Sequence, residues 1–287
     1  MTDSAHVASL PGFDLHMHST ASDGALSPSE LVTMAAAASI KYMALTDHDT
    51  LAGLSEADRA AQAVGITLIP GVELTCLWGN RVLHLLGLGI DPDFSGWQAY
   101  ESRLVELRDA RAERIAEKLI ARRVPDNILE LARAQSEGGQ IGRPHFARAL
   151  LLAGLVSSEN EAFDRYLGQG KAGDVKAQWP DIAEAINIIK ASGGFAILAH
   201  PTKYNLTFSK LRLLLAELAK SGIDGFEVGC PNVSNDQIGL LLRVAENLDL
   251  KISSGSDFHS PDLTWTRLGR FPKFDSERHL IHDFIKH

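Results

Sequence analysis

Residues 14–24, DLHMHSTASDG, place two histidines one residue apart at the end of a short apolar segment, with Asp23 five residues after the second. The surrounding GFDLHMHS alternates as a β-strand does. Strand side chains repeat with period two, so His16 and His18 should point to the same side. Two adjacent imidazoles repel when both are protonated, and a divalent metal ion removes that conflict. On this stretch alone, a metal site and a pair of surface histidines on an edge strand are both consistent with the pattern.

Strand-like and helix-like segments alternate outward from this stretch. We expect strands over residues 13–18, 42–49, 66–74, 82–90, 195–200, 225–230 and 251–259, and helices over 27–39, 54–65, 181–192, 209–222 and 235–248. In the first helix, Ser27 and Glu30 form a capping box and Pro28 takes the first helical position. The alternation favours parallel βαβ units and an α/β fold.

Residues 93–175 break this alternation. The segment WQAYESRLVELRDARAERIAEKLIARR (97–123) is amphipathic and highly charged, and helical patterns continue to about residue 155 without an intervening strand. We therefore expect a helical cap subdomain at 93–175, inserted between the fourth and fifth strands of a barrel formed by residues 1–92 and 176–287.

Candidate ligand side chains cluster at the predicted ends of strands. The positions are His16, His18, Asp47, His48, Asp49, Glu73, His84, His200, Asp257 and His259, with Asp23 in the loop after the first strand. The carboxyl ends of parallel barrel strands converge on one face, where active sites are built. The 11 histidines also include His145 in the helical segment, and His6, His279, His282 and His287 near the termini, which we expect to be ordinary surface residues.

Composition narrows the class of protein. The formal charge of −8 over 287 residues argues against a broad grip on long nucleic acid, although bound cations would let a small phosphorylated substrate enter. Cys76 and Cys230 form no C-x-x-C pattern, so free thiols in a reducing compartment are expected. The first residues lack a basic start and an apolar core, and no apolar run reaches about 18 residues, so we expect a cytoplasmic protein without a membrane span.

Six ordered motifs carry a resemblance to a known family. DLHMHSTASDG, TDHD, PGVE, VLHLLG, LAHP and GSDFH resemble, in order, the motifs of the PHP (polymerase and histidinol phosphatase) phosphoesterases. The resemblance implies a distorted (β/α)7 TIM-like barrel that holds two or three Mn²⁺, Zn²⁺ or Fe ions. The helical insertion bearing GRPHFAR is similar to the subgroup of 3′,5′-nucleoside bisphosphate phosphatases and a related 5′–3′ exoribonuclease.

The resemblance also implies three ion positions. It assigns His16, His18, Glu73 and Asp257 to the first, Glu73 with His84 and His200 to the second, and Asp23, His48 and His259 to the third. Asp23 stands where many relatives have a histidine, which favours Mn²⁺ over Zn²⁺ there. Independently, imidazole and carboxylate ligands without thiolate suit Mn²⁺, Fe²⁺ or Zn²⁺ in an open catalytic site.

Two aspartates and one glutamate near these ligands have supporting roles in our interpretation. Asp47 and Asp49 either orient ligand histidines or cap the following helix, and we favour orientation. Glu227 is taken as a structural partner and not as a ligand.

Arg143, His145 and Lys203 are the candidate substrate contacts. An arginine fork suits bidentate phosphate recognition, so GRPH could reach a substrate phosphate if the insertion folds over the barrel mouth. Alternatively, Arg143 pairs with a carboxylate and His145 opens a helix. His145, His259 and Asp47 complete the candidate catalytic set.

The sequence thus predicts a metal-dependent phosphomonoesterase in which a metal-bound hydroxide attacks phosphorus in line. The resemblance makes the 3′-phosphate of nucleoside 3′,5′-bisphosphates, such as adenosine 3′,5′-bisphosphate, the leading target. The alternatives are a 5′–3′ exonuclease on short RNA or DNA, a histidinol-phosphatase-like enzyme, and a metal-stabilised module without turnover. The arginine-rich part of residues 108–123 keeps the exonuclease open, although its mixed charges at helical spacing usually mark a solvated face.

Overall fold

The computed structural model describes residues 12–136, 138–176, 178–264, 266–274 and 276–285; His6 and His287 lie outside them. Within these ranges seven strands form one sheet in sequence order. The strands are β1 (Phe13–Asp14), β2 (Tyr42–Leu45), β3 (Thr67–Trp78), β4 (Arg81–Leu88), β5 (Phe195–Leu198), β6 (Gly225–Gly229) and β7 (Lys251–Ser254). Neighbouring strands are parallel, except that β4 runs antiparallel to both β3 and β5.

The direction of β4 corrects the expectation of parallel units throughout. Only Gly79 and Asn80 separate β3 from β4, and a parallel connection needs a crossover of a dozen or more residues. Gly79 takes φ of 58° in this turn, a value that glycine adopts at little cost. The hairpin also makes β3 longer than expected, so Glu73 lies in the middle of that strand and not at its end.

The extended segments after β1 and β7 lie against each other. Leu15 N donates to Ser254 O (3.3 Å), Asp257 N to His16 O (2.9 Å), and His18 N to Phe258 O (2.9 Å). These bonds join the segments that follow the first and the last strand of the sheet, and they place the DLHMH and GSDFH motifs side by side.

Helices flank the sheet; the first five lie where the sequence predicts, and the last, near the C-terminus, was not predicted. They are α1 (Pro28–Ala37), α2 (Leu54–Val64), α7 (Ile182–Ala191), α8 (Phe208–Ser221), α9 (Asn235–Leu248) and α10 (Ile281–Ile285), with a 3₁₀ turn η2 (Pro201–Tyr204). The predicted capping box of α1 is confirmed, with Glu30 N bound to Ser27 Oγ at 3.3 Å and Ser27 N bound to the Glu30 carboxylate at 2.8 Å. None of the described helices is both long and apolar enough to cross a membrane.

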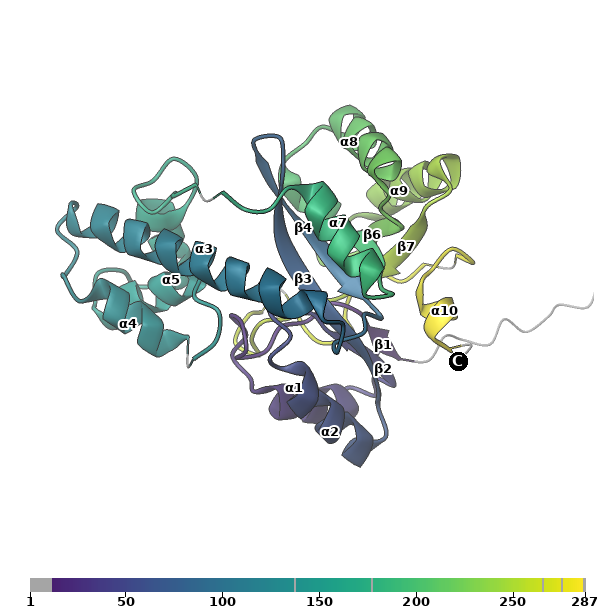
Figure 1. Cartoon of the computed structure of the whole chain (residues 1–287), viewed down its shortest axis with the longest axis horizontal. Helices are drawn as coiled ribbons and strands as arrows, with labels where there is room; N and C mark the ends of the chain where they lie inside the picture. Colours follow the sequence, from purple (N-terminus) through teal and green to yellow (C-terminus); the bar gives the residue numbers. More distant parts are fainter. Residues whose placement is uncertain (1–11, 137, 177, 265, 275, 286–287) are drawn as a thin grey trace, which may run out of the picture.

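Helices also form the segment between β4 and α7. They are α3 (Gly96–Ile120), α4 (Ile128–Gln135), α5 (Arg143–Leu152), α6 (Glu159–Ala162) and the π-helical turn η1 (Phe163–Leu167). We call them the cap lobe. α4 and α5 lie beside the outer end of the long α3, away from the sheet (Figure 1). They enclose an apolar cluster of their own that includes Ile115, Leu119, Phe146 and Leu150; the boundaries at 93 and 175 stay predictions.

His279 corrects another expectation. It is 2% exposed, not a surface residue, and its ring packs on Phe13 with ring centroids 4.9 Å apart. Its Nδ1 accepts from Ile281 N (3.1 Å) and its Nε2 bonds Ser254 Oγ (3.0 Å). The side chain therefore fastens the C-terminal helix to β7.

Candidate metal centre

The two histidines of the DLHMH motif lie at the centre of the site. His16 and His18 are both fully buried, and their Nε2 atoms lie 3.1 Å apart on the same side of the extended segment after β1. The period-two prediction of their orientation is confirmed.

Glu73 on β3 brings the other histidines to this pair. Its Oε2 lies 3.2 Å from His16 Nε2, His18 Nε2 and His48 Nδ1, and its Oε1 lies 3.0 Å from His84 Nδ1 and His200 Nε2. One carboxylate therefore contacts five imidazoles from four parts of the chain, since His16 and His18 belong to the same segment. Glu73 and His84 enter from within β3 and β4, the two strands of the antiparallel hairpin, and the other ligand candidates come from loops or the segments following strands.

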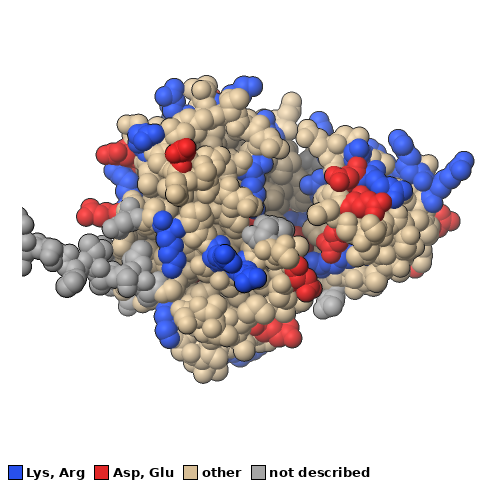
Figure 2. All heavy atoms as spheres, turned by 180° about the vertical axis from the view of Figure 1, so that it is seen from behind, with Lys and Arg blue, Asp and Glu red and all other residues tan. Residues whose placement is uncertain are grey.

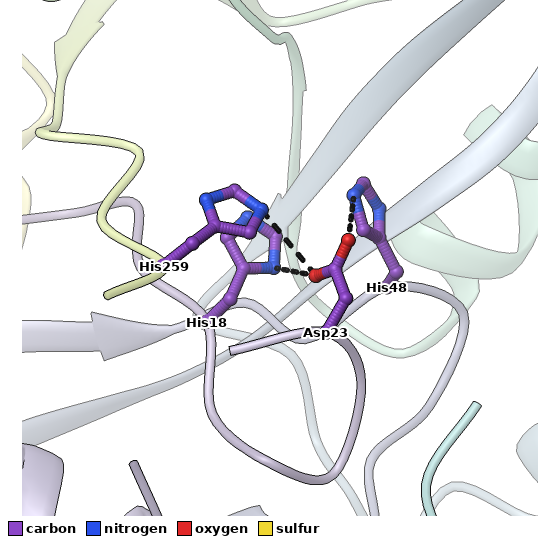
Figure 3. A group of neighbouring side chains, drawn as sticks. All are labelled: His18, Asp23, His48 and His259. Carbon is purple, nitrogen blue, oxygen red and sulfur yellow. Dashed lines mark ion pairs between the residues drawn. The ribbon is translucent and has the colours of Figure 1, made fainter. Parts of the chain in front are cut away.

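Two aspartates flank this arrangement. Asp257 Oδ1 lies 3.4 Å from His16 Nε2 and 3.3 Å from His18 Nε2. Asp23 stands between His48 and the stacked rings of His18 and His259 (Figure 3), with its Oδ1 3.3 Å from His259 Nε2. Three groups result in which one donor atom of each residue lies within 4.8 Å of the others: His16, His18, Glu73 and Asp257; His48, Glu73 and His84; and His18, Asp23, His48 and His259.

The unsatisfied donor atoms of this cluster fit divalent cations. Among the described residues, buried atoms without a hydrogen-bond partner include His18 Nδ1, Asp23 Oδ1, His48 Nδ1, Glu73 Oε2 and His200 Nδ1. Leaving buried polar atoms unpaired is costly. Bound ions would satisfy the atoms of His18, Asp23, His48 and Glu73, whereas His200 turns its Nε2 and not its Nδ1 toward Glu73. The mixed nitrogen and oxygen donor set matches Mn²⁺, Fe²⁺ or Zn²⁺.

The protonation states of Glu73 and His48 agree with that fit. Burial raises the pKa of the Glu73 carboxyl, yet the imidazoles of His48 and His16 hold that pKa well below its usual range. Burial lowers the pKa of His48 far enough to leave its ring neutral. Anionic carboxylates and neutral imidazoles are the forms that bind metal. Burial lowers the pKa of His16 and His18, but the neighbouring carboxylates outweigh it and raise the pKa of His16 well above its usual range and that of His18 to about 10, so an ion bound by these two rings would displace their protons.

Glu227 on β6 orients the cluster from behind. Its Oε1 lies 3.1 Å from His16 Nδ1, and its Oε2 accepts from His200 N at 2.6 Å. With Nδ1 occupied, His16 turns Nε2 toward the cluster, as carboxylate–histidine pairs do in metal sites. These contacts agree with the interpretation of Glu227 as a structural partner.

Asp47 and Asp49 do not contact the histidines in the way we favoured. Asp47 accepts from Ser19 N, Ser19 Oγ and Ser22 Oγ, each at 2.7 Å, and so holds the loop that carries Asp23. Asp49 accepts from Thr75 N (2.6 Å) and Arg108 Nε (2.8 Å), which ties α3 of the cap lobe to the sheet. Neither carboxylate is a member of the three groups above.

A cavity of about 400 Å³ joins the cluster to the cap lobe. Its lining includes Asp23, His48 and His84 of the cluster, four cationic side chains (Arg108, Arg111, Arg143 and Lys176) and one further carboxylate, Asp174. The guanidinium groups of Arg108 and Arg111 lie 5.4 and 5.8 Å from the Trp179 ring centroid. Burial lowers the pKa of Arg111 to about 10, and the nearby Arg143 and Arg108 charges add to this shift. The cavity is therefore suited to an anion.

The predicted substrate contacts fall in different places. Arg143 lines the cavity, with its guanidinium 5.9 Å from the Phe163 ring centroid and Nη1 3.2 Å from Leu167 O. His145 instead takes the alternative role: it is 1% exposed, and its Nδ1 accepts from Gly142 N (2.9 Å) at the start of α5. Lys203 forms an ion pair with Asp257 at the edge of the cluster.

Sequence reasoning missed Arg108 and Arg111 as individual site residues, because their segment was read as a mostly solvated face. Their spacing of three residues places them on the same face of α3, and this face is turned toward the sheet. The burial of the salt bridge from Arg108 to Asp49 depends on tertiary packing, which the local charge pattern does not contain.

Comparison with known proteins gives the family. The PHP domain model matches residues 14–220. The chain belongs to the PHP family. It is 45% identical over 258 residues to a 5′-3′ exoribonuclease of Haemophilus influenzae, which covers 90% of this chain and 93% of that protein. It is 37% identical over 252 residues to a 3′,5′-nucleoside bisphosphate phosphatase of Chromobacterium violaceum, covering 88% of each.

A solved structure agrees with this assignment. An amidohydrolase from Chromobacterium violaceum with bound sulfate and no metal matches with a TM-score of 0.88 and 34% identity over 96% of both chains. The predicted resemblance and fold class are thus confirmed. As a member of this metal-dependent phosphoesterase family, the protein is a hydrolase of phosphoric esters, which excludes the module without turnover.

Proposed function

We propose that this enzyme hydrolyses the 3′-phosphate of nucleoside 3′,5′-bisphosphates to a nucleoside 5′-monophosphate and phosphate. The observation that carries this proposal is the cavity between the histidine–carboxylate cluster and the arginines of the cap lobe. A small molecule with a phosphate at each end can present one to the cluster and the other to Arg111 and Arg143. The similarity to a bisphosphate phosphatase supports the same substrate.

The proposed ion ligands are the nine residues that the motifs indicated. His16, His18, Glu73 and Asp257 would hold one ion, Glu73 with His84 and His200 a second, and Asp23, His48 and His259 a third. Mn²⁺ is our first choice, because Asp23 supplies an oxygen ligand at the third position where many relatives have a histidine, and no thiolate is present. Bound there, the ions would activate water and offset charge on the phosphoryl oxygens.

The other residues position the substrate. Arg111 and Arg143 would bind the 5′-phosphate, and the surrounding cap lobe would limit the water that reaches the cluster. His259 serves as a ligand in this scheme, since its ring nitrogens lie 3.3 Å from Asp23 Oδ1 and 3.5 Å from Asp257 Oδ1. Because His145 is buried and its Nδ1 accepts the Gly142 N–H, we assign it no proton transfer.

A substrate panel tests the proposal. In the presence of Mn²⁺, kcat/KM for phosphate release should be higher for a nucleoside 3′,5′-bisphosphate than for the 3′-monophosphate. Arg111→Met should raise KM about ten- to hundred-fold for the bisphosphate, the effect of losing one charged hydrogen bond, and leave KM for the 3′-monophosphate unchanged. Arg114→Met is the matched control, because Arg114 is exposed on the same helix. Equal kcat/KM for bisphosphate and monophosphate would refute the proposal.

A second candidate is 5′–3′ exonuclease activity on short RNA, favoured by the 45% identity to an exoribonuclease. Both reactions would break the bond between phosphorus and the 3′-oxygen of the nucleoside. In RNA the phosphate also carries the next nucleotide, where the bisphosphate carries none. Figure 2 shows lysines and arginines of one face mixed with acidic residues, so we expect short substrates and no long nucleic acid. Stepwise release of 5′-mononucleotides from 5′-phosphorylated trinucleotides would establish this activity. A cytoplasmic location, with its reduced thiols and nucleotides, fits either substrate.

A further inference from the structure

Asp23 occupies a different structural setting from most of the cluster. Figure 3 shows its carboxylate between His48 on one side and His18 with His259 on the other, at the top of a loop. Ser22 N and Gly24 N both donate to Ser19 O, at 3.1 and 2.9 Å, which closes a turn over residues 19–24. The position of the Asp23 carboxylate depends on what holds this turn.

The sheet holds the first half of the turn. Three hydrogen bonds of 2.7 Å run from Ser19 N, Ser19 Oγ and Ser22 Oγ to Asp47, which directly follows Thr46 at the end of the β2 segment. Thr20 N also donates to Leu26 O (2.8 Å) and Ala25 N to His259 O (2.7 Å), so contacts outside the cap lobe hold the ends of the turn, and none of them involves the carbonyl oxygens of Ala21 and Asp23.

The cap lobe holds the other side. Arg148 on α5 donates from Nη2 to the Asp23 carbonyl oxygen (2.7 Å), and Gln140 N donates to the Ala21 carbonyl oxygen (3.1 Å). Gly139 lies so close that a Cβ atom there would sit 2.4 Å from Thr20 O and 2.8 Å from Ala21 O. Thus side-chain, backbone and steric contacts from the cap lobe all meet the turn.

We propose that the cap lobe positions Asp23 for the third ion, with Arg148 as the positioning residue. The inference rests on the proposed ion ligands. A ligand held in place by neighbouring groups binds its ion more tightly than one on a free loop, and loss of such an outer partner weakens metal binding about 10- to 100-fold. The insertion therefore acts on the ion site as well as on the substrate cavity.

The test counts and titrates bound Mn²⁺ in the full chain. In calorimetric titration, Arg148→Met should weaken the binding of one of the three ions about 10- to 100-fold. The other two ions should bind with wild-type affinity, whereas a general loss of structure would weaken all three. Gly139→Ala, which displaces the turn without removing a charge, should weaken the same ion.

Glu159→Gln is the matched control. Glu159 forms an ion pair with Arg148, its carboxylate 3.7 Å from Arg148 Nε. This variant leaves the hydrogen bond from Arg148 to the Asp23 carbonyl oxygen intact. It should bind all three ions as the wild type does. The inference would be overturned if Glu159→Gln weakened the binding of this ion as much as Arg148→Met does, or if Arg148→Met and Gly139→Ala both bound it with wild-type affinity. Neither result would affect the proposed ion ligands. A wild-type chain that binds two ions would also overturn the inference, whereas one that binds none would refute the proposed ion ligands first.

Discussion

Replacing Arg108 with methionine should weaken the attachment of the cap lobe to the sheet. Arg108 is 8% exposed; its Nε donates to Asp49 Oδ2 at 2.8 Å and its Nη1 to Ile141 O at 3.3 Å. Asp49 is fully buried, and without Arg108 its carboxylate would keep hydrogen bonds from Thr75 alone among the residues that the structure describes. Breaking a buried ion pair costs about 3–5 kcal/mol. Because Arg108 borders two cavities that water can enter, we expect the lower end of that range.

Equilibrium urea unfolding near neutral pH measures this loss. Arg103→Met is the control, because its ion pair with Glu184 is half exposed and should contribute less than about 1 kcal/mol. The double variant Asp49→Asn/Arg108→Met should recover about 1 kcal/mol or more relative to Arg108→Met, since no unpaired charge stays buried. If Arg108→Met costs no more than Arg103→Met, the buried pair does not hold the cap lobe and the reasoning fails.

Three further outcomes follow from the geometry. Glu227→Gln removes the anionic partner of His16 Nδ1 and should weaken Mn²⁺ binding about tenfold in calorimetric titration; unchanged affinity would contradict this. Chelation should abolish phosphate release and Mn²⁺ should restore it; activity that survives exhaustive chelation would argue against metal dependence. Burial lowers the pKa of His279 from 6.5 to about 3, so below about pH 6.5 the unfolded chain binds the extra proton and the free energy of unfolding falls by about 1.4 kcal/mol per pH unit. His279→Asn should flatten this decline in urea unfolding at several pH values, and a curve parallel to that of the wild type would refute it.

Local patterns were sufficient for much of the fold. Alternating segments predicted the strand and helix positions, and the Ser27–Glu30 spacing predicted a helix start, because both depend on neighbouring residues. The same patterns failed for β4: an apolar strand reads alike in either direction, and only the short turn at Gly79 reveals that it reverses. The expectation that His279 is a surface residue was wrong for a related reason, because proximity to a terminus does not tell whether a helix folds back on the sheet.

The sequence by itself determined the family, the α/β class and the set of histidines and carboxylates that could meet. Strand periodicity sets the face on which each of these side chains lies, and the order of the motifs identifies the family. Only the tertiary structure decided which groups support these side chains. Glu227 behind His16, Asp49 against Arg108, and Arg148 on the Asp23 turn join residues that are far apart in the chain. Such contacts depend on how separate elements pack, and no local pattern records that packing.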